Sequence, residues 1–208
     1  MATKTDVGGE SPGADLARML SGQRMFLENV YSLMRFLETE VTKRGWDLVK
    51  NGGYVITRNG YSSSLTTFSD EWAISQAGIA FVQAGQAALR QGVTSTQIPS
   101  EGIDILVFQV RWLSKAPEEP VVWHARLSVE PEGSTKPKKW EDYQSAVFNK
   151  LDPEARPDGA RSGAVKPGHV SRGGAAIVYT GSYGEVPVAE IETQADVVSQ
   201  LIEPALTG

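Results

Sequence analysis

The sequence predicts an α+β domain: a largely antiparallel sheet with a central hairpin at about residues 103–130, packed by a long N-terminal helix and a second, small-residue-rich helix. Apolar residues recur at helical spacing near the N-terminus and alternate along 103–130 as in strands. With 208 residues, 40% of them hydrophobic, the chain is long enough for one core. We therefore expect a flexible leader at 1–14 and a single domain at 15–208.

The first predicted helix begins at Asp15 and ends near Gly45, which follows two basic residues as is typical of a helix C-terminus. Its apolar residues are spaced by 7, 3, 4, 3 and 4 positions, which places them on one face of a helix. A second apolar row widens this face, so we expect the helix to lie in the core or at an interface. The two rows are Leu20, Leu27, Val30, Met34, Leu37, Val41 and Phe26, Leu33, Phe36.

Two short strands and the second helix are expected next. The strands are predicted at 46–49 and 54–58, on either side of an Asn-Gly-Gly turn signal. The helix is predicted over 70–91, with Ser69 as its N-cap and acidic residues in its first turn. Small residues on one side would allow close packing: Ala73, Ala77, Gly78, Ala80, Ala84, Gly85, Ala87 and Ala88.

The central hairpin is predicted from two runs in which apolar and polar residues alternate. The segment between these runs is polar and bounded by proline, which indicates a turn. Alignment of the two apolar faces gives a register for the hairpin. It places Trp112 opposite Val121, Val110 opposite Trp123, and Phe108 opposite Ala125.

The last third of the chain mixes helix, loop and strand signals. A short amphipathic helix is predicted at 140–151, followed by a long mobile loop at about 152–174. Two strands are expected at 175–180 and 186–191. A capping-box sequence that starts at Thr193 then opens a final short helix.

The second face of the hairpin carries the candidate ligand-binding residues. In the aligned register Gln109 lies opposite His124, and Arg111 and Arg126 share the same surface. Guanidinium groups bind carboxylate or phosphate through paired hydrogen bonds, and histidine can change its charge near neutral pH. We therefore treat these four residues as a candidate anion site. The alternatives are an ordinary solvated strand face, which antiparallel sheets commonly have, or a face whose polar groups are paired with Glu130, Glu38 or Glu40 from a covering helix.

Several chemistries are disfavoured by composition and motifs. The chain has no cysteine, which excludes disulfides and thiolate metal sites, and its net charge of −5 argues against nucleic-acid binding. Phosphate-binding glycine motifs and serine-nucleophile motifs are missing, and two distant histidines cannot form a helical zinc site. We expect no metal and no cofactor. No apolar stretch approaches the roughly 20 residues that span a bilayer, and no signal peptide is recognised, so a cytoplasmic location without membrane contact is expected.

The preferred functional interpretation is a non-catalytic interaction or assembly subunit of a soluble cytoplasmic complex, with a protein partner or self-association into a homo-oligomer. The wide apolar face of the first helix and the lack of catalytic motifs favour it. One alternative is a nuclease-like, metal-dependent enzyme that acts on phosphate or phosphodiester groups through the hairpin's polar face. Another is a sensor of a small anionic ligand, covered by the loop at 152–174. The sequence assigns no catalytic residue and leaves open whether the protein is an enzyme.

Overall fold

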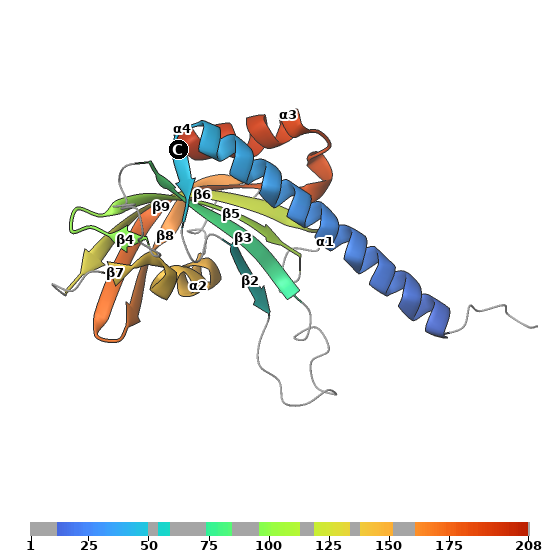
Figure 1. The fold of residues 1–208 in the computed structure, drawn as a ribbon, viewed down its shortest axis with the longest axis horizontal. Helices are drawn as coiled ribbons and strands as arrows, with labels where there is room; N and C mark the ends of the chain where they lie inside the picture. The colour runs from blue at the N-terminus through green and yellow to red at the C-terminus, as the bar shows by residue number, and fades with distance from the viewer. Residues whose placement is uncertain are drawn as a thin grey trace, which may run out of the picture.

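The computed structural model describes residues 12–49, 54–58, 74–84, 96–112, 119–133, 138–151 and 161–207. Within these ranges it confirms the α+β class, with a long N-terminal helix against an antiparallel sheet (Figure 1). Residues 1–11 of the predicted leader lie outside the described residues, and the first helix already begins at Pro12. The helical elements are α1 (Pro12–Lys43), α2 (Trp140–Lys150), the 3-10 turn η2 (Val188–Glu190), α3 (Gln194–Asp196), the π-helical turn η3 (Val197–Ile202) and α4 (Glu203–Thr207).

Seven strands form the main sheet in the order β1-β3-β5-β6-β9-β8, and β2 also pairs with β3. Every pairing in this sheet is antiparallel. The predicted hairpin is confirmed as β5 and β6, which pair at the centre of the sheet. The strands are β1 (Trp46–Leu48), β2 (Tyr54–Arg58), β3 (Ile74–Gln83), β5 (Ile103–Arg111), β6 (Val121–Glu132), β8 (Ser162–Arg172) and β9 (Ala175–Pro187), with β4 (Gln97–Ile98) and β7 (Lys138–Lys139) in a separate pair.

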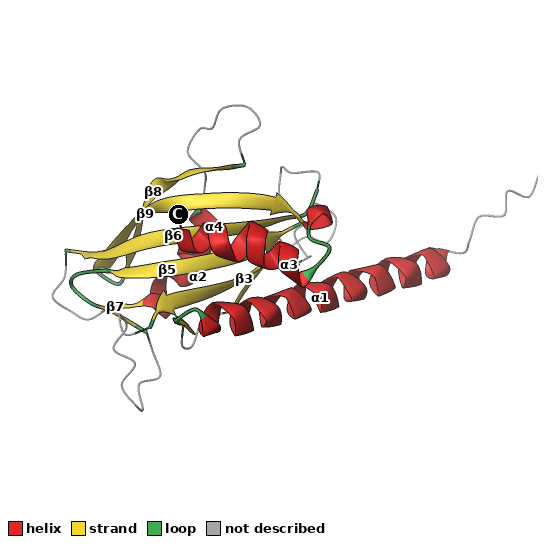
Figure 2. Ribbon diagram, turned by 90° about the horizontal axis from the view of Figure 1, so that it is seen from above, coloured by secondary structure: helices red, strands yellow, loops and turns green. Residues whose placement is uncertain are grey.

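Helices cover both faces of this sheet. α1 and the C-terminal helical segment lie on one face, and α2 lies on the other (Figures 1 and 2). Successive side chains of a strand point to opposite faces, so Val107 packs in the core beneath α2 and Phe108 in the core beneath α1. Both are buried. The two central strands are therefore apolar on both sides, so their apolar pattern does not define one register.

The predicted first helix is confirmed, although only its second half packs on the sheet. Val30, Met34, Leu37 and Val41 are buried, as their spacing predicts. The helix ends at Lys43, and Gly45 follows with φ +84, the left-handed conformation that favours glycine. The N-terminal half extends beyond the edge of the sheet (Figures 1 and 2).

The predicted second helix over 70–91 is wrong, because the described part of this segment is strand β3. β3 lies inside the sheet and is covered on both faces, so its run from Ile79 to Val82 is continuously apolar and gives no alternation. The small residues of this segment are explained by close packing between the sheet and α2, not by packing of a helix. A Cβ atom at Gly78 would overlap the ring of Phe148 in α2, so glycine there lets α2 approach the sheet closely.

The predicted mobile loop at 152–174 is also corrected. Residues 152–160 lie outside the described residues, but Ser162–Arg172 form the edge strand β8. Gly173 and Gly174, with φ of +59 and +78, make the tight turn into β9, a two-residue hairpin signal. Pro167 interrupts the pairing only at a register shift, which an edge strand tolerates. Beyond this turn, β9 is one continuous strand instead of the two expected, and it ends at Pro187.

The two short helices predicted late in the chain are confirmed. α2 buries Trp140, Tyr143 and Val147 on the face that their spacing predicts. The capping box is present before α3: the amide of Asp196 donates to Thr193 Oγ1 at 3.2 Å, and the amide of Thr193 donates to Asp196 Oδ2 at 2.7 Å. The turns that follow close the core beneath α1.

Candidate functional site

The register of the central hairpin separates the four candidate binding residues. Gln109 lies opposite Trp123 and faces α2, whereas His124 lies on the opposite face of β6, beneath α1 and the C-terminal segment. The predicted register is wrong by one residue, and a one-residue slip moves a side chain to the other face. Apolar residues occupy both faces of β5 and β6, so the pattern could not fix the alignment. Arg111 accordingly shares the face of Gln109, and Arg126 that of His124.

On the α2 face, Arg111 is held by groups of its own chain. Its Nε and Nη2 atoms donate to Gln109 Oε1 at 3.0 and 2.8 Å, and Nη2 also donates to the Leu151 carbonyl at 3.1 Å. The guanidinium carbon lies 3.7 Å from the centroid of the Trp123 ring. Leu151 follows the last turn of α2, where backbone carbonyls attract cations. Arg111 therefore caps a helix C-terminus.

On the other face, Arg126 has an equivalent arrangement. Its Nη1 donates to the Leu206 carbonyl in α4 at 3.0 Å, and its Nη2 donates to Asp104 Oδ2 at 3.0 Å. His124, two residues earlier, is 7% exposed, and burial lowers its pKa to about 4. At neutral pH this imidazole is uncharged and adds no positive charge for an anion. The four predicted residues therefore lie in two separate clusters, one on each face of the sheet, and do not share one surface.

Arg111→Ala is expected to lower the free energy of unfolding by about 2 kcal/mol. The substitution leaves Gln109 Oε1, in a residue that is 1% exposed, without the guanidinium, and such losses cost about 1–3 kcal/mol. Urea unfolding followed by circular dichroism measures this change. The matched control is Arg161→Ala, which removes only an exposed pair with Glu190 and should leave the free energy of unfolding close to that of the wild type. If phosphate stabilised the wild type but not Arg111→Ala, and the substitution itself left stability unchanged, Arg111 would instead be an anion ligand.

Exposed apolar side chains point to a different functional surface, on α1. The large apolar residues that are exposed in the described part of the chain are Leu20, Met25 and Tyr31, at 57%, 62% and 63%. All three lie in α1. Every side chain described between Ala14 and Met25 is exposed, and we call this stretch the projecting segment. Single exposed apolar residues are normal on proteins, but three within four turns of one helix form a candidate contact surface.

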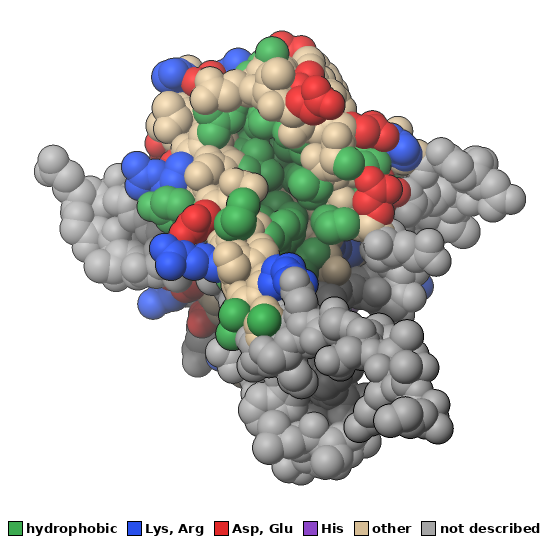
Figure 3. Space-filling model, turned by 90° about the vertical axis from the view of Figure 1, so that its right-hand side faces the viewer, with side chains coloured by type: hydrophobic (Ala, Val, Ile, Leu, Met, Phe, Trp, Pro, Cys, Tyr) green, Lys and Arg blue, Asp and Glu red, His purple; other side chains and the backbone are tan. Residues whose placement is uncertain are grey.

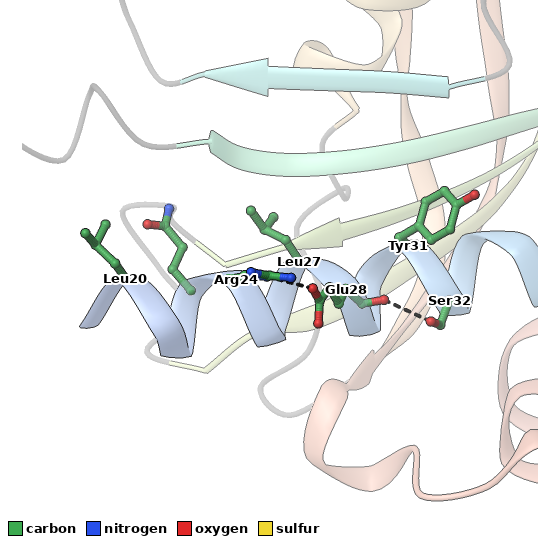
Figure 4. A pocket seen from close by; sticks show the side chains of 7 residues that line it. Leu20, Arg24, Leu27, Glu28, Tyr31 and Ser32 are labelled. Atoms are coloured by element: carbon green, nitrogen blue, oxygen red, sulfur yellow. Dashed lines mark hydrogen bonds and ion pairs between the residues drawn. The ribbon is translucent and has the colours of Figure 1, made fainter. Parts of the chain in front are cut away.

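One side of α1 continues the buried row past the sheet. Leu20, Leu27 and Tyr31 point to the same side of the helix and, with neighbouring polar side chains, line a shallow hollow (Figure 4). Leu20 and Leu27 belong to the row whose later members, Met34 and Val41, are buried on the sheet. This row has a seven-residue interval, the repeat of helices that pack on other helices.

The second feature is an apolar groove between α1 and the chain that follows β9. Phe26, Leu33 and Phe36 form its α1 wall, and Val188 and Ile191 form the opposite wall. Viewed from the side toward which α1 projects, apolar side chains gather in the middle of this face, with acidic side chains beside them (Figure 3). Phe26 packs edge-to-face against Trp112 with 5.1 Å between ring centroids, which holds the Phe26 ring in its place in the groove wall.

Gly22 is unexplained by the packing of its own chain. It lies within the projecting segment, and a Cβ atom there would meet nothing within 4 Å. Glycine inside a helix costs about 1 kcal/mol relative to alanine. Helix periodicity could have marked Gly22, Met25 and Tyr31 as exposed, but the sequence does not show where the sheet ends beneath the helix. We therefore did not identify them from the sequence.

Among the residues whose side chains are described, no three His, Asp or Glu residues are grouped in a way that could hold a metal ion. No helix in the described ranges is both long enough and apolar enough to cross a membrane. No family model, curated protein or solved structure matches this chain.

Proposed function

We propose that this protein is a self-assembling subunit without catalytic activity, and that the projecting segment of α1 joins it to a second copy. The observation that carries this proposal is that the large apolar residues exposed in the described part of the chain all lie on this one helix, with Leu20 and Met25 in the projecting segment and Tyr31 shortly after it. Burial of such side chains contributes roughly 1.5–3 kcal/mol each. In a dimer that buries these residues, each copy contributes every burial once, so each burial contributes twice to the stability of the dimer.

The charge of the helix supports a second copy as the partner. Residues 12–28, which include the projecting segment, contain two basic residues, Arg18 and Arg24, and two acidic ones, Asp15 and Glu28, so this half of the helix is neutral overall. The projecting segment itself has a net charge of only +1. Two copies of this half of the helix can therefore approach without net repulsion. A strongly charged segment would instead have favoured a partner of opposite charge.

The two predicted alternatives lose their common basis. Both were predicted to use the hairpin's polar face, whereas in the observed register Gln109 and Arg111 lie on one face of the sheet and His124 and Arg126 on the other. Each guanidinium also has intramolecular partners at about 3 Å. The assembly interpretation needs neither a charged site nor a metal.

Light scattering of the full chain after gel filtration tests this function. The wild type is expected to have twice the chain mass of 22.5 kDa, and Leu20→Glu/Met25→Glu is expected to have the mass of one chain, because two carboxylates would be buried in an apolar interface. Thr39→Glu is the matched control, at an exposed position in the half of α1 that packs on the sheet, and should keep the wild-type mass. Circular dichroism checks that each variant remains folded. An unchanged mass for the double variant would exclude the projecting segment as the interface.

A further inference from the structure

We infer that the two copies pair with their α1 helices antiparallel, and that the projecting segment of each copy lies in the apolar groove of the other. This inference rests on the proposed function and adds the arrangement of the partners. It joins two features of the described residues: a helical segment whose described side chains are exposed and a groove whose apolar walls are only partly covered.

The projecting segment has the residue distribution of a helix held between two walls. Leu20 and Met25 are five residues apart, which separates them by about 140° around the helix axis. Both are more than half exposed. A helix that packs on one flat surface needs one apolar side, whereas a helix within a groove meets apolar groups on both sides. The groove supplies such walls from α1 and from Val188 and Ile191.

This arrangement also explains why a glycine occupies position 22. Gly22 lies on the same side of α1 as Met25, three residues away, and Asn29 and Leu33 of the groove continue that side. Without a Cβ atom at Gly22, two helix backbones can approach more closely there. The open space around Gly22 within one chain is the space that the second helix would fill.

The symmetry of a dimer follows from the position of both features on one helix. The groove wall is formed by the part of α1 after Phe26, and the projecting segment ends at Met25. A two-fold axis near this boundary, perpendicular to the helix, places the projecting segment of each copy beside the groove wall of the other. Both contacts then form at once, which is the closed, self-complementary geometry of most protein dimers.

Charges on the two surfaces are complementary. Glu192 is exposed and lines the groove on the wall opposite α1. Arg24 lies four residues after Leu20, on the side of the projecting segment that would face that wall. Its partner within the chain is Glu28 at 2.9 Å, an exposed pair that can be exchanged at little cost. The arrangement therefore brings Arg24 of one copy toward Glu192 of the other.

Disulfide trapping tests the arrangement directly, because the wild-type chain contains no cysteine. The double variant Leu20→Cys/Ile191→Cys is oxidised at the concentration where the wild type is dimeric, and covalent products are separated without reductant. A disulfide requires Cα atoms within about 7 Å, so only direct contact of the projecting segment with the second wall gives a product. We expect a covalent dimer from the double variant and none from either single variant.

Two further variants keep the test independent of trapping. Gly22→Leu should raise the dimer dissociation constant about tenfold or more, with an unchanged circular dichroism spectrum, because leucine fills the space of the second helix. Arg24→Glu should weaken the dimer, and the added substitution Glu192→Arg should restore it.

The possible outcomes separate the two proposals. A covalent dimer from Leu20→Cys alone would show that the helices meet along the Leu20 and Leu27 row, and would overturn the groove arrangement while self-assembly stands. A dimeric wild type with no covalent dimer from the double variant and no effect of Gly22→Leu would overturn it as well. A wild type that is monomeric at every concentration would overturn both the arrangement and the proposed function.

Discussion

Gly181→Ala is expected to destabilise the folded protein by about 3 kcal/mol, one of the largest effects of a single methyl group in this chain. Gly181 in β9 lies directly opposite Leu127 in β6. A Cβ atom at Gly181 would overlap the carbonyl oxygen of Arg126 and lie 3.0 Å from Leu127 Cα. These are backbone atoms of a central strand, so no side-chain rotation relieves the overlap, and overpacking of this kind costs about 1–3 kcal/mol or more.

Urea unfolding of Gly181→Ala measures this loss, with Gly163→Ala as the matched control. Gly163 is in the edge strand β8, where an added Cβ would make only an ordinary contact of 3.8 Å with the Tyr183 ring. We expect Gly163→Ala to be neutral or slightly stabilising. Equal stability of the two variants would contradict the close pairing of β6 with β9.

Acid should destabilise the protein through His124. Burial lowers its pKa from 6.5 to about 4 in the folded state, whereas the unfolded chain keeps the ordinary pKa near 6.5. Above pH 6.5 both states are neutral at this residue and it adds no pH dependence. Between pH 6.5 and 4 only the unfolded state binds the proton, so stability falls as the pH falls, by about 3 kcal/mol at about 1.4 kcal/mol per pH unit.

The comparison of His124→Gln with the wild type isolates this effect. Carboxyl groups also contribute to acid unfolding, since a hydrogen bond from Lys43 lowers the pKa of Glu40 and hydrogen bonds from Thr193 lower that of Asp196. The slope of unfolding free energy against pH should be shallower between pH 6.5 and 4 in His124→Gln, whatever its stability at pH 7. The same slope in His124→Gln would contradict the buried, neutral imidazole.

Local sequence signals predicted the elements that have one buried face and one solvent-exposed face. α1 and α2 have clear helical spacing, Gly45 follows the end of α1, and the Thr193 capping box marks the start of α3, as expected. β3 was mistaken for a helix because it is buried on both faces. An apolar run rich in small residues then carries no period that separates strand from helix. The conformation of β3 is therefore determined by its burial in the folded protein, not by a local sequence pattern.

The candidate site depended on contacts between residues far apart in the chain, which the sequence did not show. Arg111 and Arg126 were predicted to bind an anion on one shared face, whereas in the structure they lie on opposite faces and donate to the carbonyls of Leu151 and Leu206. No local pattern shows that two helices end beside these strands. Leu20, similarly, was assigned to the apolar face of the first helix, but the position of the sheet edge beneath that helix decides that it is exposed.

Sedimentation equilibrium of the unmodified chain over a wide concentration range tests the central claim most directly. Self-assembly through α1 predicts a mass of twice 22.5 kDa that falls toward one chain mass on dilution, because each chain is folded in its own right. A mass of one chain at every concentration would contradict the account. The exposed apolar residues of α1 would then have to contact a partner other than a second copy.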